Sequence, residues 1–168
     1  HTVLENPDRF ILMFAPISRT FERSYADPGP LPPLPPFRRN HIRLPDTVEE
    51  NLAFLQAWQE RCHMDAFVYD YPLGRAHYGD LGYCAIARVL AQDIRNGYCS
   101  CQELRAALPN AWPNYLMGHM LWDSSLDPQQ LQEEYFTALY GPGAADARAA
   151  LEELSALTSP DYFNGIGP

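Results

Sequence analysis

Lysine is absent from this chain of 168 residues, so its 12 basic residues are all arginines. Acidic residues number 21, which gives a formal net charge of −9 and a pI near 4.9. A surface that binds nucleic acid needs clustered cations to neutralise phosphates, and an anionic membrane attracts the same kind of cluster. We therefore expect neither nucleic acid nor a membrane as a partner. A carbohydrate, or another neutral or cationic small molecule, fits this charge better.

Long apolar runs are also missing. None approaches the ~20 residues that a membrane-spanning helix requires. The first residues, 1–7, show no charged-then-apolar signal pattern. A processed or truncated start would look the same, so the sequence leaves localisation open.

Cysteine is scarce, and the four present do not form a disulfide framework by their spacing. Cys99 and Cys101 lie two apart on an expected strand, point the same way and are poorly placed to bridge each other. Together with His119 they lack both Cys-x-x-Cys spacing and a fourth ligand for zinc. We expect reduced thiols in the core, no metal and no cofactor.

What the chain does contain is an alternation of strand and helix patterns. Short apolar runs rich in aromatic and β-branched residues indicate buried strands, whereas apolar residues at helical spacing indicate helices. Val48, Leu52, Leu55, Trp58 and Cys62 are expected to share a face of the first helix. In the second helix Asp80 is the expected cap, and the expected apolar face is formed by Tyr83, Ile86, Ala87, Leu90 and Ile94. The expected elements are strands at 10–17, 65–71 and 97–102 and helices at 47–61, 80–94, 113–121, 128–140 and 144–157.

A long connection over residues 18–46 separates the first strand from the first helix. Its centre, residues 28–36, is so rich in proline that it predicts a stiff polyproline-like loop. Leu31-Pro-Pro-Leu-Pro-Pro36 followed by Arg38 resembles the ligand of a peptide-recognition domain. The simpler interpretation is a rigid loop that walls the rim of an active site.

The order strand, helix, strand, helix, strand predicts parallel strands joined by right-handed crossovers. A full (β/α)8 barrel usually needs about 250 residues. Two fold classes remain: the C-terminal portion of a (β/α)8 (TIM) barrel followed by helices, or a small three-strand α/β domain. We favour the barrel, with residues 1–123 as the partial barrel and 124–168 as a C-terminal helical segment, because a free-standing sheet would expose both edge strands.

Five stretches between about residue 6 and residue 157 form a recognisable set: Phe10-Ile-Leu-Met-Phe-Ala-Pro-Ile-Ser-Arg19-Thr, Asn51-Leu-Ala-Phe-Leu-Gln-Ala-Trp58, Phe67-Val-Tyr-Asp70-Tyr-Pro-Leu, Asn96-Gly-Tyr-Cys-Ser-Cys-Gln-Glu103-Leu-Arg105-Ala and Pro113-Asn-Tyr-Leu-Met-Gly-His-Met-Leu-Trp122-Asp123. Together they resemble one bacterial family of unknown function, grouped with the TIM-barrel glycoside hydrolases. The architecture of this family is similar to that of α-glucuronidases and β-hexosaminidases. The resemblance implies that the remainder of a larger barrel chain completes the fold, and leaves bacterial cytoplasm, periplasm and the exterior open as locations.

Two acids follow neighbouring strands at the end where barrel enzymes place their catalytic groups. Glycoside hydrolysis uses two carboxylates that flank the scissile bond, and Asp70 and Glu103 are the candidates for this pair. Each also has a structural explanation: Asp70 as the partner of Arg75 or a turn cap, and Glu103 as an acid at a helix N-terminus. A catalytic pair outside this chain would leave both as ligands of substrate hydroxyls.

Further residues near the same strand ends are candidates for substrate binding. An arginine at the end of the first strand suits the carboxylate of a uronic acid, although a surface salt bridge is the structural alternative. Aromatic rings could stack on sugars but more often belong to a core. The candidates are Arg19, Tyr71, Arg75, His77, Arg105 and Trp112.

These expectations lead to a probable glycoside hydrolase that acts on an oligo- or polysaccharide with a two-carboxylate mechanism. The alternative is a non-catalytic carbohydrate-binding or scaffold module. The two differ in whether Asp70 and Glu103 face a common pocket.

Overall fold

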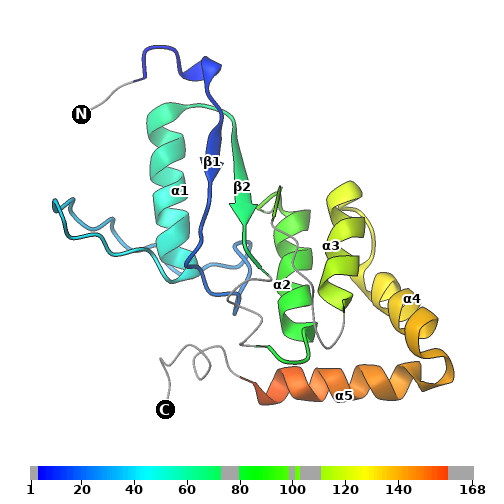
Figure 1. Cartoon of the computed structure of the whole chain (residues 1–168). Coiled ribbons are helices and arrows are strands. Elements are labelled where there is room, and N and C mark those ends of the chain that lie inside the picture. The colour runs from blue at the N-terminus through cyan, green and yellow to red at the C-terminus, as the bar shows by residue number, and fades with distance from the viewer. Residues whose placement is uncertain (1–3, 73–79, 99–100, 103–110, 159–168) are drawn as a thin grey trace.

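The structure, a computed structural model, describes residues 4–72, 80–98, 101–102 and 111–158 (Figure 1). It is an α/β protein in which two helices alternate with the three strands of a small sheet, and three further helices follow. The elements are η1 (Pro7–Arg9), β1 (Leu12–Phe14), α1 (Val48–Cys62), β2 (Ala66–Asp70), α2 (Cys84–Arg95), β3 (Cys101–Gln102), α3 (Trp112–Trp122), α4 (Pro128–Tyr140), η3 (Gly141–Gly143) and α5 (Ala144–Leu157).

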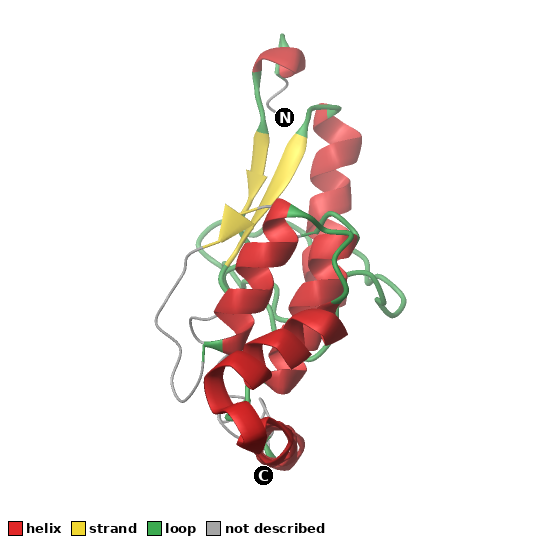
Figure 2. Cartoon of the chain, turned by 90° about the vertical axis from the view of Figure 1, so that its right-hand side faces the viewer, coloured by secondary structure: helices red, strands yellow, loops and turns green. Residues whose placement is uncertain are grey.

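The three strands are parallel and lie in the order β1-β2-β3. Leu12 pairs with Ala66, and Tyr69 pairs with Cys101, so the carboxyl ends of the strands meet at one edge. The helices lie on one side of this sheet in Figure 2. Leu12 and Phe14 pack toward α1, whereas Met13 points to the other face and is exposed.

The prediction of a TIM-barrel portion is wrong. The described residues form a small open sheet of three, five and two residues per strand, and no further strand follows among the helices of residues 111–158. The alternative, a small three-strand α/β domain, agrees in part. Exposed edges were the argument for the barrel, but very short edge strands such as β1 and β3 offer few unpaired backbone groups.

Helix α1 covers the pair β1 and β2. The Thr47 side chain accepts a hydrogen bond from the Glu50 amide at 3.1 Å, and so caps the helix as the sequence indicates. Val48 and Leu52 pack with Val68 of β2 in a small core, which also contains Leu55 and Tyr25.

Trp58 was expected on the same apolar face of α1, and this expectation is wrong, because the residue is 49% exposed. At 100° per residue it lies at the edge of the arc formed by Leu52, Leu55 and Cys62, where helix α1 already turns toward solvent.

A larger core joins α2 to α3, α4 and α5. The face of α2 predicted from helical spacing is confirmed, since Ile86, Leu90 and Ile94 are all buried. Leu116 of α3 and Phe136 of α4 belong to the same core. The predicted domain boundary at residue 123 therefore falls between helices that share one core.

The start of α2 is clasped to α5 by a buried carboxylate. The helix begins at Cys84, four residues later than expected, because Asp80 acts from outside it. Asp80 accepts hydrogen bonds from the Tyr83 amide (3.0 Å), the Ile86 amide (2.8 Å) and the Ser155 hydroxyl (2.5 Å). The Ser155 hydroxyl in turn accepts from the Cys84 amide at 3.0 Å. This Asp80–Ser155 clasp ties the orphan amides of α2 to a helix more than 70 residues away.

Gly82 permits this approach of α5. A Cβ atom at this position would lie 1.9 Å from the Leu151 carbonyl oxygen and 2.4 Å from Ser155 Oγ. Because the nearer atom belongs to a helix backbone, it cannot move aside without displacing α5. Any side chain at residue 82 is therefore expected to break the clasp.

Replacing Gly82 by alanine is expected to destabilise the protein by about 1–3 kcal/mol, the usual range for an overpacked core. Chemical denaturation of the two proteins gives the difference in the free energy of unfolding. Gly118→Ala in α3 is the matched control, because its Cβ would meet nothing within 4 Å. That control is expected to gain about 0.5–1 kcal/mol from helix propensity. Equal effects of the two substitutions would contradict this account of Gly82.

Candidate functional site

The carboxyl edge of the sheet holds a buried arginine between two aspartates. Arg19 follows β1, Asp70 ends β2, and Asp93 lies in the last turns of α2. Arg19 Nη1 lies 2.9 Å from Asp70 Oδ2 and 2.9 Å from Asp93 Oδ2, and none of these three side chains is exposed to solvent. A single guanidinium thus joins three separate segments.

The remaining polar atoms of these side chains are also engaged. Arg19 Nη2 donates to the Arg23 carbonyl at 3.1 Å, and Nε donates to the Thr20 carbonyl at 3.2 Å. Asp70 Oδ1 accepts from the Tyr71 amide at 2.8 Å. The loop after β1 is thereby held against the sheet edge.

Asp93 is the second anchor of this loop. Its Oδ1 accepts hydrogen bonds from the Ser24 hydroxyl at 2.5 Å and from the Tyr25 amide at 2.8 Å. The Arg19 guanidinium lies over two aromatic rings, 4.2 Å from the Phe21 centroid and 3.8 Å from that of Tyr25. These cation–π contacts compensate part of the desolvation of the buried cation.

The cluster carries one cation and two carboxylates, and burial makes the second negative charge unfavourable. Burial raises the pKa of Asp70 to about 6, which the Arg19 guanidinium and the Tyr71 amide only partly offset. Asp93 raises it further. Burial lowers the pKa of Arg19, but Asp70, Tyr25 and Asp93 together outweigh it, so that this pKa is raised overall. Arg19 therefore stays charged, and Asp70 is the group that takes up a proton.

This geometry gives Asp70 a structural role among the described residues. It is an ion-paired acid, as one sequence-based alternative held, and its partner among the described residues is Arg19. Arg75, the partner named by that alternative, lies outside these residues. Both Arg19 and Asp70 lie beneath the surface, so neither contacts a ligand in this arrangement. Catalysis by Asp70 and substrate binding by Arg19 stay predictions.

The other predicted site residues divide into two groups. Tyr71 is half-buried with its ring 5.2 Å from that of Tyr69, and Trp112 is buried at the start of α3 against Tyr135 and Phe136. Both belong to aromatic clusters, although Trp112 also borders a groove described next. The remaining candidates, Glu103, Arg75, His77 and Arg105, lie outside the described residues.

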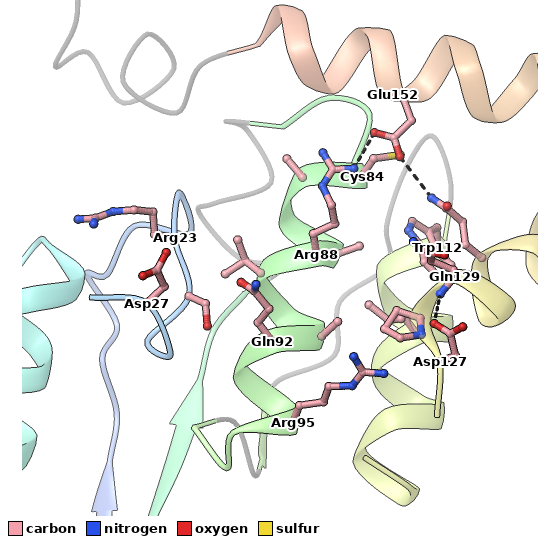
Figure 3. A pocket seen from close by; sticks show the side chains of 18 of the residues that line it. Arg23, Asp27, Cys84, Arg88, Gln92, Arg95, Trp112, Asp127, Gln129 and Glu152 are labelled. Atoms are coloured by element: carbon pink, nitrogen blue, oxygen red, sulfur yellow. Dashed lines mark hydrogen bonds and ion pairs between the residues drawn. The ribbon is translucent and has the colours of Figure 1, made fainter. Parts of the chain in front are cut away.

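An open groove of about 810 Å³ runs along the exposed side of α2, opposite its buried face (Figure 3). Arg88, Gln92 and Arg95 project from successive turns of the helix into it. The loop after β1 brings Arg23 and Asp27 to one side. Helices α3, α4 and α5 form the rest of the wall with residues that include Trp112, Asp127, Gln129, Gln132 and Glu152.

Several of these side chains hold one another in place. Arg88 Nη1 lies 2.7 Å from Glu152 Oε2, and Gln132 Nε2 donates to Glu152 Oε1 at 3.4 Å. Asp127 Oδ1 accepts from the Gln129 amide at 3.0 Å as the cap of α4. The groove therefore presents fixed polar groups from α2, α4 and α5.

The floor of the groove is apolar and chemically inert. Ala91, Val89 and Leu116 line it between the polar side chains. Cys84 also lines it, but burial raises the pKa of this thiol to about 12, so the reactive thiolate is not formed near neutral pH. The Cys84 thiol is therefore not an activated nucleophile in this groove.

Sequence reasoning missed this groove. Its signal was the exposed stripe of α2, where Arg88, Gln92 and Arg95 follow helical spacing opposite the buried face. Every amphipathic helix has such a polar stripe on its solvent-exposed face, so the pattern by itself does not predict a binding groove. Only the tertiary placement of the loop after β1 and of α4 turns it into a groove.

The described residues also bear on ligands of other classes. Across residues 4–72, 80–98, 101–102 and 111–158, no three His, Cys, Asp or Glu side chains gather as metal ligands would. No helix in the same ranges has both the length and the apolar character needed to cross a membrane.

The pKa of Asp70 predicts a pH-dependent stability. Because this pKa is raised from 3.8 to about 6, the folded state binds more protons than the unfolded state between these values. The contribution of Asp70 to the free energy of unfolding therefore becomes less favourable as pH rises from 4 to 6, by up to about 3 kcal/mol. Asp70→Asn cannot titrate, so the difference in unfolding free energy between variant and wild type is expected to move in favour of the variant over this range.

Urea unfolding at pH 4, 5, 6 and 7 measures that difference. Carboxylates whose pKa is lowered, such as Glu49 beside the Gly29 amide and Glu50 beside Arg43, act in the opposite direction. They are common to both proteins and cancel in the comparison. A difference that does not change with pH would show that Asp70 titrates normally.

Comparisons of the chain with protein-family models, with curated proteins and with solved structures found no match. The family resemblance therefore stays a prediction, and the geometry of the site is what supports a function.

Proposed function

We propose that this protein is a carbohydrate-binding module without hydrolytic activity of its own, and that the groove along α2 is its binding site. The observation that carries this proposal is the row Arg88, Gln92 and Arg95, faced across one groove by carboxylate and amide side chains of other elements.

The chemistry of the groove suits a ligand rich in hydroxyl groups. Guanidinium, amide and carboxylate groups are planar and present paired donors or acceptors, which match neighbouring hydroxyls of a sugar ring. The apolar floor of Ala91, Val89 and Leu116 offers contact to the less polar ring faces. Specific pockets commonly combine such a floor with a few fixed polar groups.

Charge in the groove also favours a neutral or weakly charged ligand. Arg88 is already paired with Glu152, and Asp127 stands near the other end of the same wall. A polyanion would meet these acids together with the chain's net charge of −9. A strongly apolar ligand would leave the polar groups of the groove desolvated.

Hydrolysis by Asp70 and Glu103 is the second candidate function. It is favoured by the position of Asp70 at the carboxyl end of β2 and by its pKa of about 6, which suits a general acid. Against it, both carboxylate oxygens of Asp70 are engaged and its side chain is fully buried. Glu103 lies outside the described residues.

Binding can be tested with neutral oligosaccharides of hexoses and of N-acetylated hexosamines, titrated into isotope-labelled protein and followed by NMR. Signals of α2 and of the start of α4 are expected to shift. Gln92→Ala removes one hydrogen-bonding amide and is expected to weaken binding about two- to tenfold, as the net value of a hydrogen bond implies. Gln56→Ala on the exposed side of α1 is the matched control and is expected to change nothing. The proposal is wrong if no sugar binds, or if Gln92→Ala binds as tightly as wild type.

Hydrolysis can be tested on the same sugars with chromogenic or reducing-end assays. The binding proposal predicts no turnover above background for the wild type. Turnover that is abolished by Asp70→Asn and Glu103→Gln would favour the second candidate instead. The unfolding free energy of each variant, measured alongside, separates lost catalysis from lost folding.

A further inference from the structure

The proline-rich loop between β1 and α1 is tied down at both ends and free at its tip. Its outgoing leg is held by Glu49, which accepts from the Gly29 amide at 2.7 Å and pairs with Arg23. Its returning leg is held by Glu50, which pairs with Arg43 and accepts from the Asp46 amide at 3.0 Å. Two neighbouring acids in the first turn of α1 thus anchor the two legs.

Beyond these anchors the loop reaches outward. In Figure 1 this stretch, coloured cyan, extends away from the sheet and the helices. Pro33, Leu34, Pro35 and Pro36 are all exposed, and the Phe37 side chain is 91% exposed. Further along, Ile42 is 85% exposed. The part of the loop beyond the anchors therefore presents both prolines and large apolar side chains to solvent.

The tip also carries a charge opposite to that of the whole molecule. Residues 28–45 contain Arg38, Arg39, Arg43 and His41 and no acidic residue, whereas the chain has a net charge of −9. Arg43 pairs with Glu50. Within the part of the chain that the structure describes, the side chains of Arg38 and Arg39 make no hydrogen bond or ion pair. These two cations are therefore available to a partner.

We propose that this tip is a docking segment for a partner protein that presents a groove of aromatic rings bordered by carboxylates. Pro33-Leu-Pro-Pro36 supplies two prolines three residues apart, the repeat at which a polyproline helix returns to the same face. Aromatic-lined grooves recognise extended proline segments of this kind. Arg38, two residues beyond Pro36, would then reach the carboxylate border in a charge-assisted hydrogen bond.

Anchoring makes this segment a better ligand than a free peptide. Proline fixes φ near −65°, and the anchors at Glu49 and Glu50 fix both legs, so the tip loses little conformational freedom on binding. One side of this segment borders α1: Pro32–Pro35, together with Arg43 and Pro45 of the returning leg, line a small cavity of about 90 Å³ against the helix. Pro33, Leu34 and Pro35 are nevertheless exposed to solvent, so they can still be reached by a partner.

The experiment uses the full chain and, as a probe, an isolated SH3 domain selective for Pro-x-x-Pro-x-Arg ligands. Isothermal titration calorimetry is expected to detect binding to the wild type. Pro36→Ala removes one of the two docked prolines, and Arg38→Glu reverses the charge at the carboxylate border. Each substitution is expected to weaken binding at least about tenfold, equivalent to about 1.4 kcal/mol.

Arg148→Glu is the matched control, because Arg148 is an exposed arginine of α5 far along the chain from the loop. It makes the same change in net charge as Arg38→Glu and is expected to leave the affinity unchanged. Circular dichroism checks that all variants keep the wild-type fold. The proposal is overturned if the wild type does not bind, if Pro36→Ala or Arg38→Glu binds as tightly as wild type, or if Arg148→Glu weakens binding as much as Arg38→Glu.

Discussion

A buried guanidinium organises the carboxyl edge of this protein. Arg19 has no access to water, so its charge must be met from within, and Asp70 and Asp93 meet it from a strand and a helix. Removing one partner of such an ion pair leaves an uncompensated buried charge, which is strongly destabilising. The loop after β1, the end of β2 and the last turns of α2 are therefore fixed together. Since that loop also forms one side of the groove along α2, the ion pairs of Arg19 with Asp70 and Asp93 help to fix the shape of the groove.

Much of the local structure could be predicted from the sequence. The helix starting after Thr47 has a cap and a regular apolar face, and the predicted buried face of α2 is confirmed by Ile86, Leu90 and Ile94. Strand positions were right in outline, although β1 covers only Leu12–Phe14 of the apolar run. Local periodicity and capping are encoded in neighbouring residues, which explains this success.

The tertiary features were less predictable. The barrel interpretation failed because strand and helix order does not determine how many strands a sheet will have. Arg19 pairs with Asp70 across 51 residues, whereas the sequence suggested a local partner for Asp70, Arg75, which lies outside the described residues. The groove depends on which elements face α2, and its polar stripe resembles any solvent-exposed helix face. Pairings between residues that are distant in the chain depend on tertiary packing, and no local sequence pattern predicts them.

The clasp between Asp80 and Ser155 has a consequence for the groove as well as for α5. Glu152 lies one turn before Ser155 on the same helix, and it is the residue that meets Arg88 across the groove. Helix α5 therefore both supports the start of α2 and forms one wall of the groove, and the close contact at Gly82 sets the distance between α5 and α2. Because residue 82 has no side chain, α5 can pack close to α2, and this spacing sets the width of a groove that Gly82 itself does not line.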